Sequence, residues 1–192
     1  MTLPTRQTVY YLPGRGGQLH SGLGQGLLDR GCDVTGRSLV GAFGSLSFAD
    51  QVDTVANDLQ QQFAHSDALV VANSFGAYLF LQAQTTMPRF QGRVLLFSPI
   101  VGLAESPKTQ QIFVPPRSES LQATVAAGLF PAPRQCEIHV GAEDWQSGPE
   151  QVIALGQHAG ITVNVVPGRG HALGKDYVGG VLHRWLLFEG PG

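Results

Sequence analysis

The chain has 192 residues, of which 43% are hydrophobic and 14% charged, and its formal net charge is −2. This length predicts one domain, residues 1–192, with a full hydrophobic core. The near-neutral charge gives no electrostatic basis for binding nucleic acid or an anionic membrane. The first residues lack a basic segment followed by an apolar one, and no apolar run is long enough to span a bilayer. We therefore expect a soluble, cytoplasmic protein.

Two cysteines, Cys32 and Cys136, lie far apart in the sequence. They form no spacing typical of metal ligands and do not require a disulfide. Each is predicted to be a small core residue at the start of a strand. No metal site and no organic cofactor are predicted.

In chain order, short runs rich in β-branched and aromatic residues alternate with segments whose apolar residues recur at helical spacing. Strands are predicted at 8–12, 32–40, 68–73, 93–98, 136–140 and 161–166, and helices at 19–31, 52–63, 75–87, 150–158 and 178–185. Glycine-rich loops are predicted at 13–17 and 41–44. Alternation of this kind implies right-handed crossovers, and therefore a three-layer α/β/α sandwich around a doubly wound, parallel, six-stranded sheet.

The pattern loosens between residues 101 and 134, where five prolines surround one short helical piece at 121–127. Connections of this length usually have a function or are disordered, and we expect a short lid-like insertion at 103–134. Its apolar residues could line a small pocket or could seal the lid to the core, which is the commoner arrangement; these residues are Ile112, Phe113, Val114, Leu121, Val125, Leu129 and Phe130.

Ser74 follows the apolar strand at 68–73 and precedes a helical segment, with Ala72 and Gly76 two residues to either side. This small-x-Ser-x-small pattern is typical of a nucleophile elbow, a sharp turn that exposes the serine hydroxyl. The letters alone fit a helix-capping serine equally well. Ser66 has the same pattern but follows a helix and precedes a strand, so the context favours Ser74.

Ligands of open parallel sheets bind beyond the carboxyl ends of the strands. The segments leaving those ends supply Ser74, the acidic pair Glu143 and Asp144, and His171. A serine needs a base within hydrogen-bond reach and a carboxylate that orients this base, which is the chemistry of a catalytic triad. The other histidines are less suitably placed: His20, His65, His139, His158 and His183. Besides Glu143 and Asp144, Glu105 is a weaker candidate for the acid.

An oxyanion hole requires two backbone N–H groups, one just after the nucleophile and one from the loop after the first strand. Phe75 and Arg15 are the predicted donors. The predicted substrate pocket comprises Gly14, Gly16, Phe43, Pro99 and Trp145. Arg15, Arg117 and Arg169 could form a cationic rim for an acidic substrate, although surface arginines are usually only solvated.

Four motifs of the chain resemble those of the α/β-hydrolase superfamily: Leu12-Pro13-Gly14-Arg15-Gly16-Gly17, Ala72-Asn73-Ser74-Phe75-Gly76, Gly141-Ala142-Glu143-Asp144 and Gly168-Arg169-Gly170-His171. They are similar to the oxyanion loop, the nucleophile elbow, the acid loop and the histidine loop. The resemblance covers nearly the whole chain and favours Asp144 over Glu143. The oxyanion loop begins with Pro-Gly instead of His-Gly, and the first elbow glycine is Ala72.

The family's usual N-terminal antiparallel hairpin and large cap domain have no counterpart in the sequence. The chain in this respect resembles the small serine hydrolases, for example those of the retinoblastoma-binding-protein-9 type. The resemblance implies a serine esterase or thioesterase that acts on a small acyl substrate through an acyl-enzyme, as a monomer or homodimer. The alternatives are a non-catalytic binding protein with this fold, or a C–C hydrolase or perhydrolase that uses the same triad.

Overall fold

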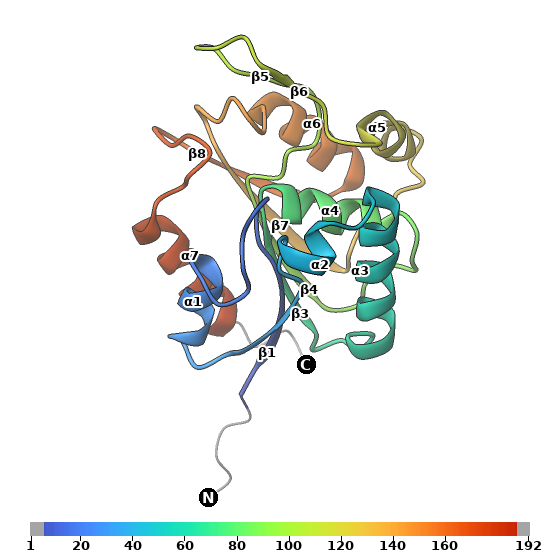
Figure 1. Cartoon of the computed structure of the whole chain (residues 1–192), viewed down its shortest axis with the longest axis vertical. Helices are drawn as coiled ribbons and strands as arrows, with labels where there is room; N and C mark the ends of the chain where they lie inside the picture. The colour runs from blue at the N-terminus through green and yellow to red at the C-terminus, as the bar shows by residue number, and fades with distance from the viewer. Residues whose placement is uncertain (1–5, 188–192) are drawn as a thin grey trace, which may run out of the picture.

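The computed structural model describes residues 6–187 of the chain. Its centre is a six-stranded sheet with the order β2-β1-β3-β4-β7-β8, in which all neighbouring strands are parallel (Figure 1). The strands are β1 (Thr8–Leu12), β2 (Asp33–Gly36), β3 (Leu69–Asn73), β4 (Arg93–Phe97), β7 (Gln135–Gly141) and β8 (Thr162–Val166). The predicted doubly wound parallel sheet is thereby confirmed.

Helices cover both faces of the sheet, which gives the predicted three layers (Figure 1). They are α1 (Leu23–Leu28), α2 (Gly41–Gly44), α3 (Phe48–Gln62), α4 (Phe75–Gln84), α5 (Ser118–Ala126), α6 (Pro149–Ala159) and α7 (Lys175–Leu187). Helices α1 and α7 share one hydrophobic cluster with the sheet, and α3, α4, α5 and α6 share the cluster on the opposite face. Strands buried on both faces explain why 93–98 shows no polar alternation.

Several predicted elements differ in extent or kind; α3 and α7 each begin at least three residues earlier than predicted. The first helix begins at Leu23 and not at Leu19, because Gly22 has φ 54°, in the left-handed region that interrupts a helix. The second strand ends at Gly36, where a Cβ would lie 2.1 Å from the carbonyl oxygen of Tyr11. Residues 41–44, predicted as a loop, form the single turn of α2.

The segment 103–134 contains a small antiparallel hairpin that the sequence analysis missed, formed by β5 (Ala104–Glu105) and β6 (Ile112–Phe113). The hairpin projects beyond the sheet edge at the top of Figure 1. The segment is tied to α4: Tyr78 donates to the carbonyl of Pro116, and the Gln82 amide donates to the carbonyl of Arg117 at 3.0 Å. Its function as a lid stays a prediction.

Of the seven apolar side chains of this segment that are predicted to line a pocket or to seal the lid, three seal the segment to the core and three are exposed to solvent. Leu121, Val125 and Phe130 are buried in the core, whereas Ile112, Val114 and Leu129 are exposed.

Between residues 6 and 187, no helix combines the length and the apolar character needed to cross a membrane. The beginning of the chain, where no signal peptide is predicted, lies outside the described residues.

A buried carboxylate joins α3 to the first two strands. Asp58 accepts a hydrogen bond from the Tyr10 hydroxyl at 2.7 Å and two from the Arg37 guanidinium, both at 2.7 Å. Burial and the charge of Asp58 raise the pKa of Tyr10 far above its usual range, so the phenol remains a donor. This three-residue contact fixes one end of the sheet against its helix layer.

We predict that Asp58→Ala lowers the free energy of unfolding by roughly 2 kcal/mol, because it leaves the buried Tyr10 hydroxyl and the Arg37 guanidinium without an acceptor. Urea denaturation followed by circular dichroism measures the change. Asp53→Ala, at an exposed position of the same helix, is the control and should change stability by less than about 0.5 kcal/mol. Equal effects of the two substitutions would contradict the prediction.

Candidate active site

Ser74 lies on the turn between β3 and α4, with φ 54° and ψ −123°. A non-glycine residue in this region costs about 1–3 kcal/mol and persists only where its surroundings hold it. Here the Ser74 N–H donates to the carbonyl of Phe97 at 2.8 Å, and the Tyr78 N–H donates to the carbonyl of Ser74 at 3.1 Å. The hydroxyl is thereby presented at the carboxyl edge of the sheet, beside the N-terminus of α4.

The glycines around Ser74 allow two backbone segments to touch. A Cβ on Gly76 would lie 2.2 Å from the carbonyl oxygen of Pro13 and 2.4 Å from that of Leu12. A Cβ on Gly14 would lie 3.3 Å from the Cβ of Ser74. The loop after β1 therefore packs directly on the serine turn, which explains why small residues occupy these positions.

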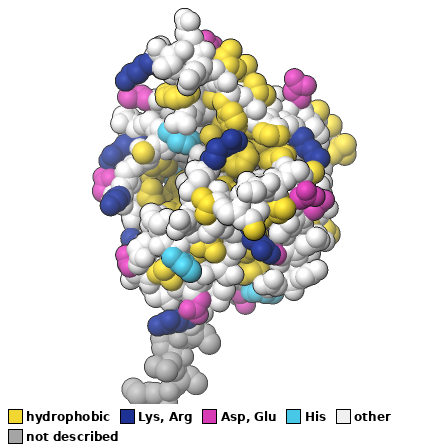
Figure 2. Space-filling view, viewed as in Figure 1, with side chains coloured by type: hydrophobic (Ala, Val, Ile, Leu, Met, Phe, Trp, Pro, Cys, Tyr) yellow, Lys and Arg dark blue, Asp and Glu magenta, His cyan; other side chains and the backbone are white. Residues whose placement is uncertain are grey.

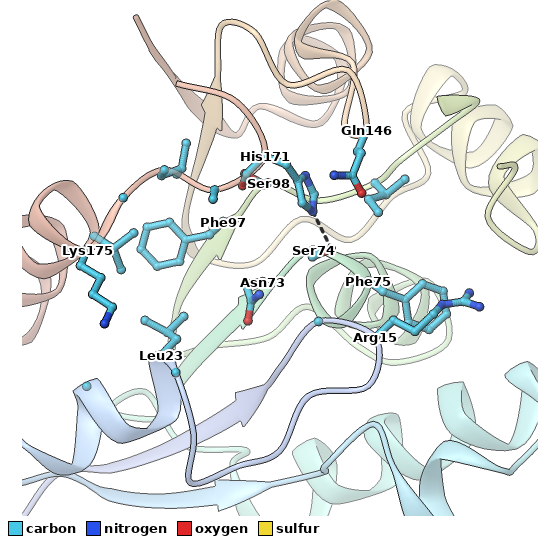
Figure 3. Close-up of a pocket in the computed structure, with 18 of the residues that line it drawn as sticks. Arg15, Leu23, Asn73, Ser74, Phe75, Phe97, Ser98, Gln146, His171 and Lys175 are labelled. Atoms are coloured by element: carbon cyan, nitrogen blue, oxygen red, sulfur yellow. Dashed lines mark hydrogen bonds between the residues drawn. The ribbon is translucent and has the colours of Figure 1, made fainter. Parts of the chain in front are cut away.

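His171 lies on the loop between β8 and α7, and its Nε2 is 2.8 Å from the Oγ of Ser74 (Figure 3). The Ser98 hydroxyl donates to the backbone carbonyl of His171 at 3.0 Å and holds this loop beside the end of β4. The imidazole is 22% exposed, so it is largely shielded but still reachable from the cavity.

Asp144 is fully buried and orients the imidazole. Both carboxylate oxygens are 3.0 Å from Nδ1 of His171, and Oδ1 also accepts from the N–H groups of Gln146 and Ser147 at 3.0 Å each. Because a carboxylate only accepts, Nδ1 carries the proton and Nε2 is left to accept from Ser74. Burial alone would raise the pKa of Asp144, but the interactions with His171 and Ser147 outweigh it and lower the pKa.

The acid and histidine loops are joined through their backbones. A Cβ on Gly141 would lie 2.2 Å from the carbonyl oxygen of Arg169, and the Glu143 N–H donates to that same oxygen at 2.9 Å. Of the three candidate acids, the structure brings Asp144 to His171, whereas Glu143 and Glu105 are exposed. Sequence reasoning missed Ser98 and Ser147, although Ser98 directly follows a buried strand.

The predicted oxyanion donors lie next to the serine. Phe75 is the first residue of α4, so its N–H has no acceptor within the helix. In the described part of the chain, no hydrogen bond uses the N–H of Phe75 or Arg15 as donor. The Arg15 guanidinium lies over the rings of Phe75 and Phe113, 4.6 and 5.1 Å from their centroids, and links the loop after β1 to the β5–β6 hairpin.

A cavity of about 1100 Å³ opens around Ser74 and His171. Figure 2 shows hydrophobic side chains inside a hollow of the molecular surface. In Figure 3, Leu23 and Phe97 lie on one side of Ser74, and Arg15 and Phe75 lie on the other. Such a volume lies at the large end of small-molecule sites.

Of the predicted pocket residues, Gly14 and Trp145 line this cavity, whereas Gly16, Phe43 and Pro99 do not. Phe43 instead packs against the core cluster beside α3. Of the three arginines proposed as a cationic rim, Arg15 lines the cavity, whereas Arg117 and Arg169 do not. Arg169 instead forms an ion pair with Asp176 at 2.8 Å. Among residues 6–187, no group of three or more His, Cys, Asp or Glu side chains could hold a metal ion.

No protein-family model matches the chain, and a comparison with curated proteins finds no match. Several solved structures are similar to this chain over nearly its whole length. Monoacylglycerol lipase from Paleococcus ferrophilus is 14% identical with a TM-score of 0.68, and the match covers 93% of both chains. Est1E from Butyrivibrio proteoclasticus is 12% identical with a TM-score of 0.65, and the match covers 95% of this chain and 87% of Est1E.

Mouse alpha/beta hydrolase domain-containing protein 10 is 11% identical with a TM-score of 0.65, over 93% of this chain and 87% of the mouse protein. The chain has the α/β-hydrolase fold. This confirms the fold that the sequence motifs implied, whereas the resemblance to the retinoblastoma-binding-protein-9 type stays a prediction.

We predict that ionised Asp144 stabilises the fold in a pH-dependent manner. Because its folded-state pKa is below the unfolded value of about 4, the stabilisation is fully present above pH ~4 and is lost as pH falls through the folded-state pKa. The difference in unfolding free energy between the wild type and Asp144→Asn should therefore shrink from pH 7 to pH 3. Urea denaturation at both values measures it, and a difference that does not change with pH would refute the prediction.

Proposed function

We propose that the protein is a serine hydrolase that cleaves a small carboxylic ester or thioester through an acyl-enzyme intermediate. The observation that carries this proposal is the continuous hydrogen-bond series from the Ser74 hydroxyl through His171 to Asp144, with distances of 2.8 and 3.0 Å. The series lies at a cavity and on a strained turn that surrounding contacts hold in place. The ester-cleaving activity in the name of the Paleococcus lipase agrees with this class of reaction.

In the proposed mechanism, the Ser74 Oγ attacks the carbonyl carbon of the substrate while its proton moves to Nε2 of His171. The negative charge on the carbonyl oxygen is stabilised by the N–H groups of Phe75 and Arg15. The bond from the carbonyl carbon to the leaving oxygen or sulfur then breaks, His171 donates its proton to that atom to give the alcohol or thiol, and the acyl group stays on Ser74. A water molecule, deprotonated by His171, releases the carboxylic acid and restores the serine.

Asp144 acts by orientation and charge. Its carboxylate holds the proton on Nδ1, so that Nε2 faces Ser74 in the form that accepts a proton. It also stabilises the imidazolium that forms when His171 takes the serine proton. The pKa of Asp144 is lowered, which agrees with a carboxylate that remains ionised throughout the cycle.

We predict that Ser74→Ala abolishes labelling by a fluorophosphonate probe and lowers kcat for p-nitrophenyl acetate by at least about 10⁴-fold, because the nucleophile is lost. Asp144→Asn should lower kcat by about 10⁴-fold, because the imidazole then adopts the wrong tautomer. Gel fluorescence and steady-state kinetics measure these effects on variants with native circular dichroism.

Ser66→Ala is the matched control, since Ser66 has the same flanking pattern but is exposed in the turn between α3 and β3. It should retain wild-type labelling and kinetics. A folded wild-type protein whose Ser74 resists the probe and that cleaves no ester would overturn the proposed function.

A further inference from the structure

The cavity around Ser74 continues into a channel between α1 and α7. We call this the α1–α7 channel and define it by six lining residues, Leu23, Gly26, Phe97, Leu173, Gly179 and Leu182. In Figure 3, Leu23 and Phe97 lie on the side of Ser74 that faces these helices, away from Arg15 and Phe75. The channel is thus continuous with the site but separate from the lid-like segment.

The inner walls of the channel are apolar, its exposed rim carries Gln25, Asp29 and Lys175, and its helices carry small residues. Phe97, Leu173 and Leu182 are buried parts of the hydrophobic cluster on this face of the sheet. Gly26 and Gly179 leave space where the two helices face each other. A Cβ at either position would meet only the guanidinium of Arg30 within 4 Å, at 3.6 and 3.1 Å respectively.

Arg30 bounds the far end of the channel. Its guanidinium donates to the carbonyl of Gly26 at 2.8 Å and to that of Gly179 at 3.3 Å, and so bridges α1 and α7. Because the guanidinium bonds to the carbonyl of Gly26, it lies about one helical turn beyond Leu23. Arg30 therefore limits the length of the channel.

The opposite side of Ser74 has a different character. It is lined by the polar Arg15 and Gln146 and by the aromatic Phe75, Phe113 and Trp145, of which Trp145 is 44% exposed. The charge of Arg15 and the exposed Trp145 lie on this side, which suits a small or polar leaving group. An extended apolar chain gains stabilisation in the α1–α7 channel, because hydrophobic stabilisation scales with the apolar area removed from water.

We propose that the α1–α7 channel binds the acyl chain of the substrate, that this chain is unbranched and of medium length, and that Gly26 and Gly179 keep the channel open. The proposal rests on the hydrolase function above and specifies its substrate class. It implies that residues of α1 and α7, and not those of the lid-like segment, limit the length of the acyl chain. Each methylene added within the channel should raise kcat/KM by roughly fourfold, until the chain reaches Arg30.

The test is a series of p-nitrophenyl esters from acetyl to dodecanoyl, assayed on the wild type and Gly179→Leu. The leucine fills the channel, so the ratio of kcat/KM for the decanoyl ester to that for the acetyl ester should fall at least about tenfold. Gly180→Leu is the matched control: Gly180 is the next residue of α7, is exposed, and a Cβ there has no neighbour within 4 Å. Both variants replace a helical glycine with the same strong helix former, and Gly180→Leu should keep the wild-type ratio.

Two results would overturn the proposal: an unchanged ratio in folded Gly179→Leu, or a flat acyl profile in an active wild type. A series of acetate esters with lengthening alcohols should be unaffected by Gly179→Leu; a selective loss there would assign the channel to the leaving group. Gly179→Ala should shift the ratio in the same direction by a smaller amount and replaces the leucine variant if that variant does not fold.

A binding measurement separates this proposal from the hydrolase function. Calorimetry with decanoate on folded Ser74→Ala should detect binding that Gly179→Leu in the same background weakens at least about tenfold, and that Gly180→Leu leaves unchanged. Absence of decanoate binding, or equal binding by all variants, refutes the channel whether or not the protein cleaves esters. A wild type that binds decanoate through the channel but cleaves no ester refutes only the proposed function.

Discussion

The geometry of the site depends on one close backbone contact, between the start of α4 and the end of β1. At Gly76 this contact leaves no room for a side chain, since a Cβ would lie 2.2 Å from the carbonyl oxygen of Pro13. The contact forces the chain to turn sharply at Ser74, whose φ of 54° is otherwise unfavourable for serine. It also brings the loop of Arg15 beside the first N–H of α4. One steric constraint thereby positions a hydroxyl and two backbone donors together.

A second backbone contact positions the remaining groups. The carbonyl of Arg169 lies against Gly141 and accepts from the Glu143 N–H, so the loops after β7 and β8 are packed on each other. Asp144 and His171 are therefore placed by rigid neighbouring strands, with Ser147 and Ser98 holding the carboxylate and the histidine backbone. Sites held by well-packed neighbours keep the sub-ångström geometry that proton transfer requires.

The sequence predicted those features that depend on local patterns. Periodicity located the central strands, and the small residues around Ser74 indicated the turn. It could not decide between Glu143 and Asp144, because both follow the same strand. In the structure, a turn from Gly141 buries Asp144 and leaves Glu143 exposed. The β5–β6 hairpin escaped prediction because strands of two residues are too short to show any alternation.

The channel between α1 and α7 lies beyond local patterns for a different reason. Leu23 and Leu182 are separated by most of the chain, and each is indistinguishable from a core residue in a helical pattern. Glycines in these helices cost roughly 0.8–1 kcal/mol each relative to alanine. In a protein whose stability is a small difference between large terms, such a cost needs a structural reason. The hydrogen bonds from Arg30 to the carbonyls of Gly26 and Gly179 hold the two helices together across the space that the glycines leave. The cavity beside the candidate nucleophile can therefore extend between α1 and α7 without the two helices separating, because Arg30 bridges them.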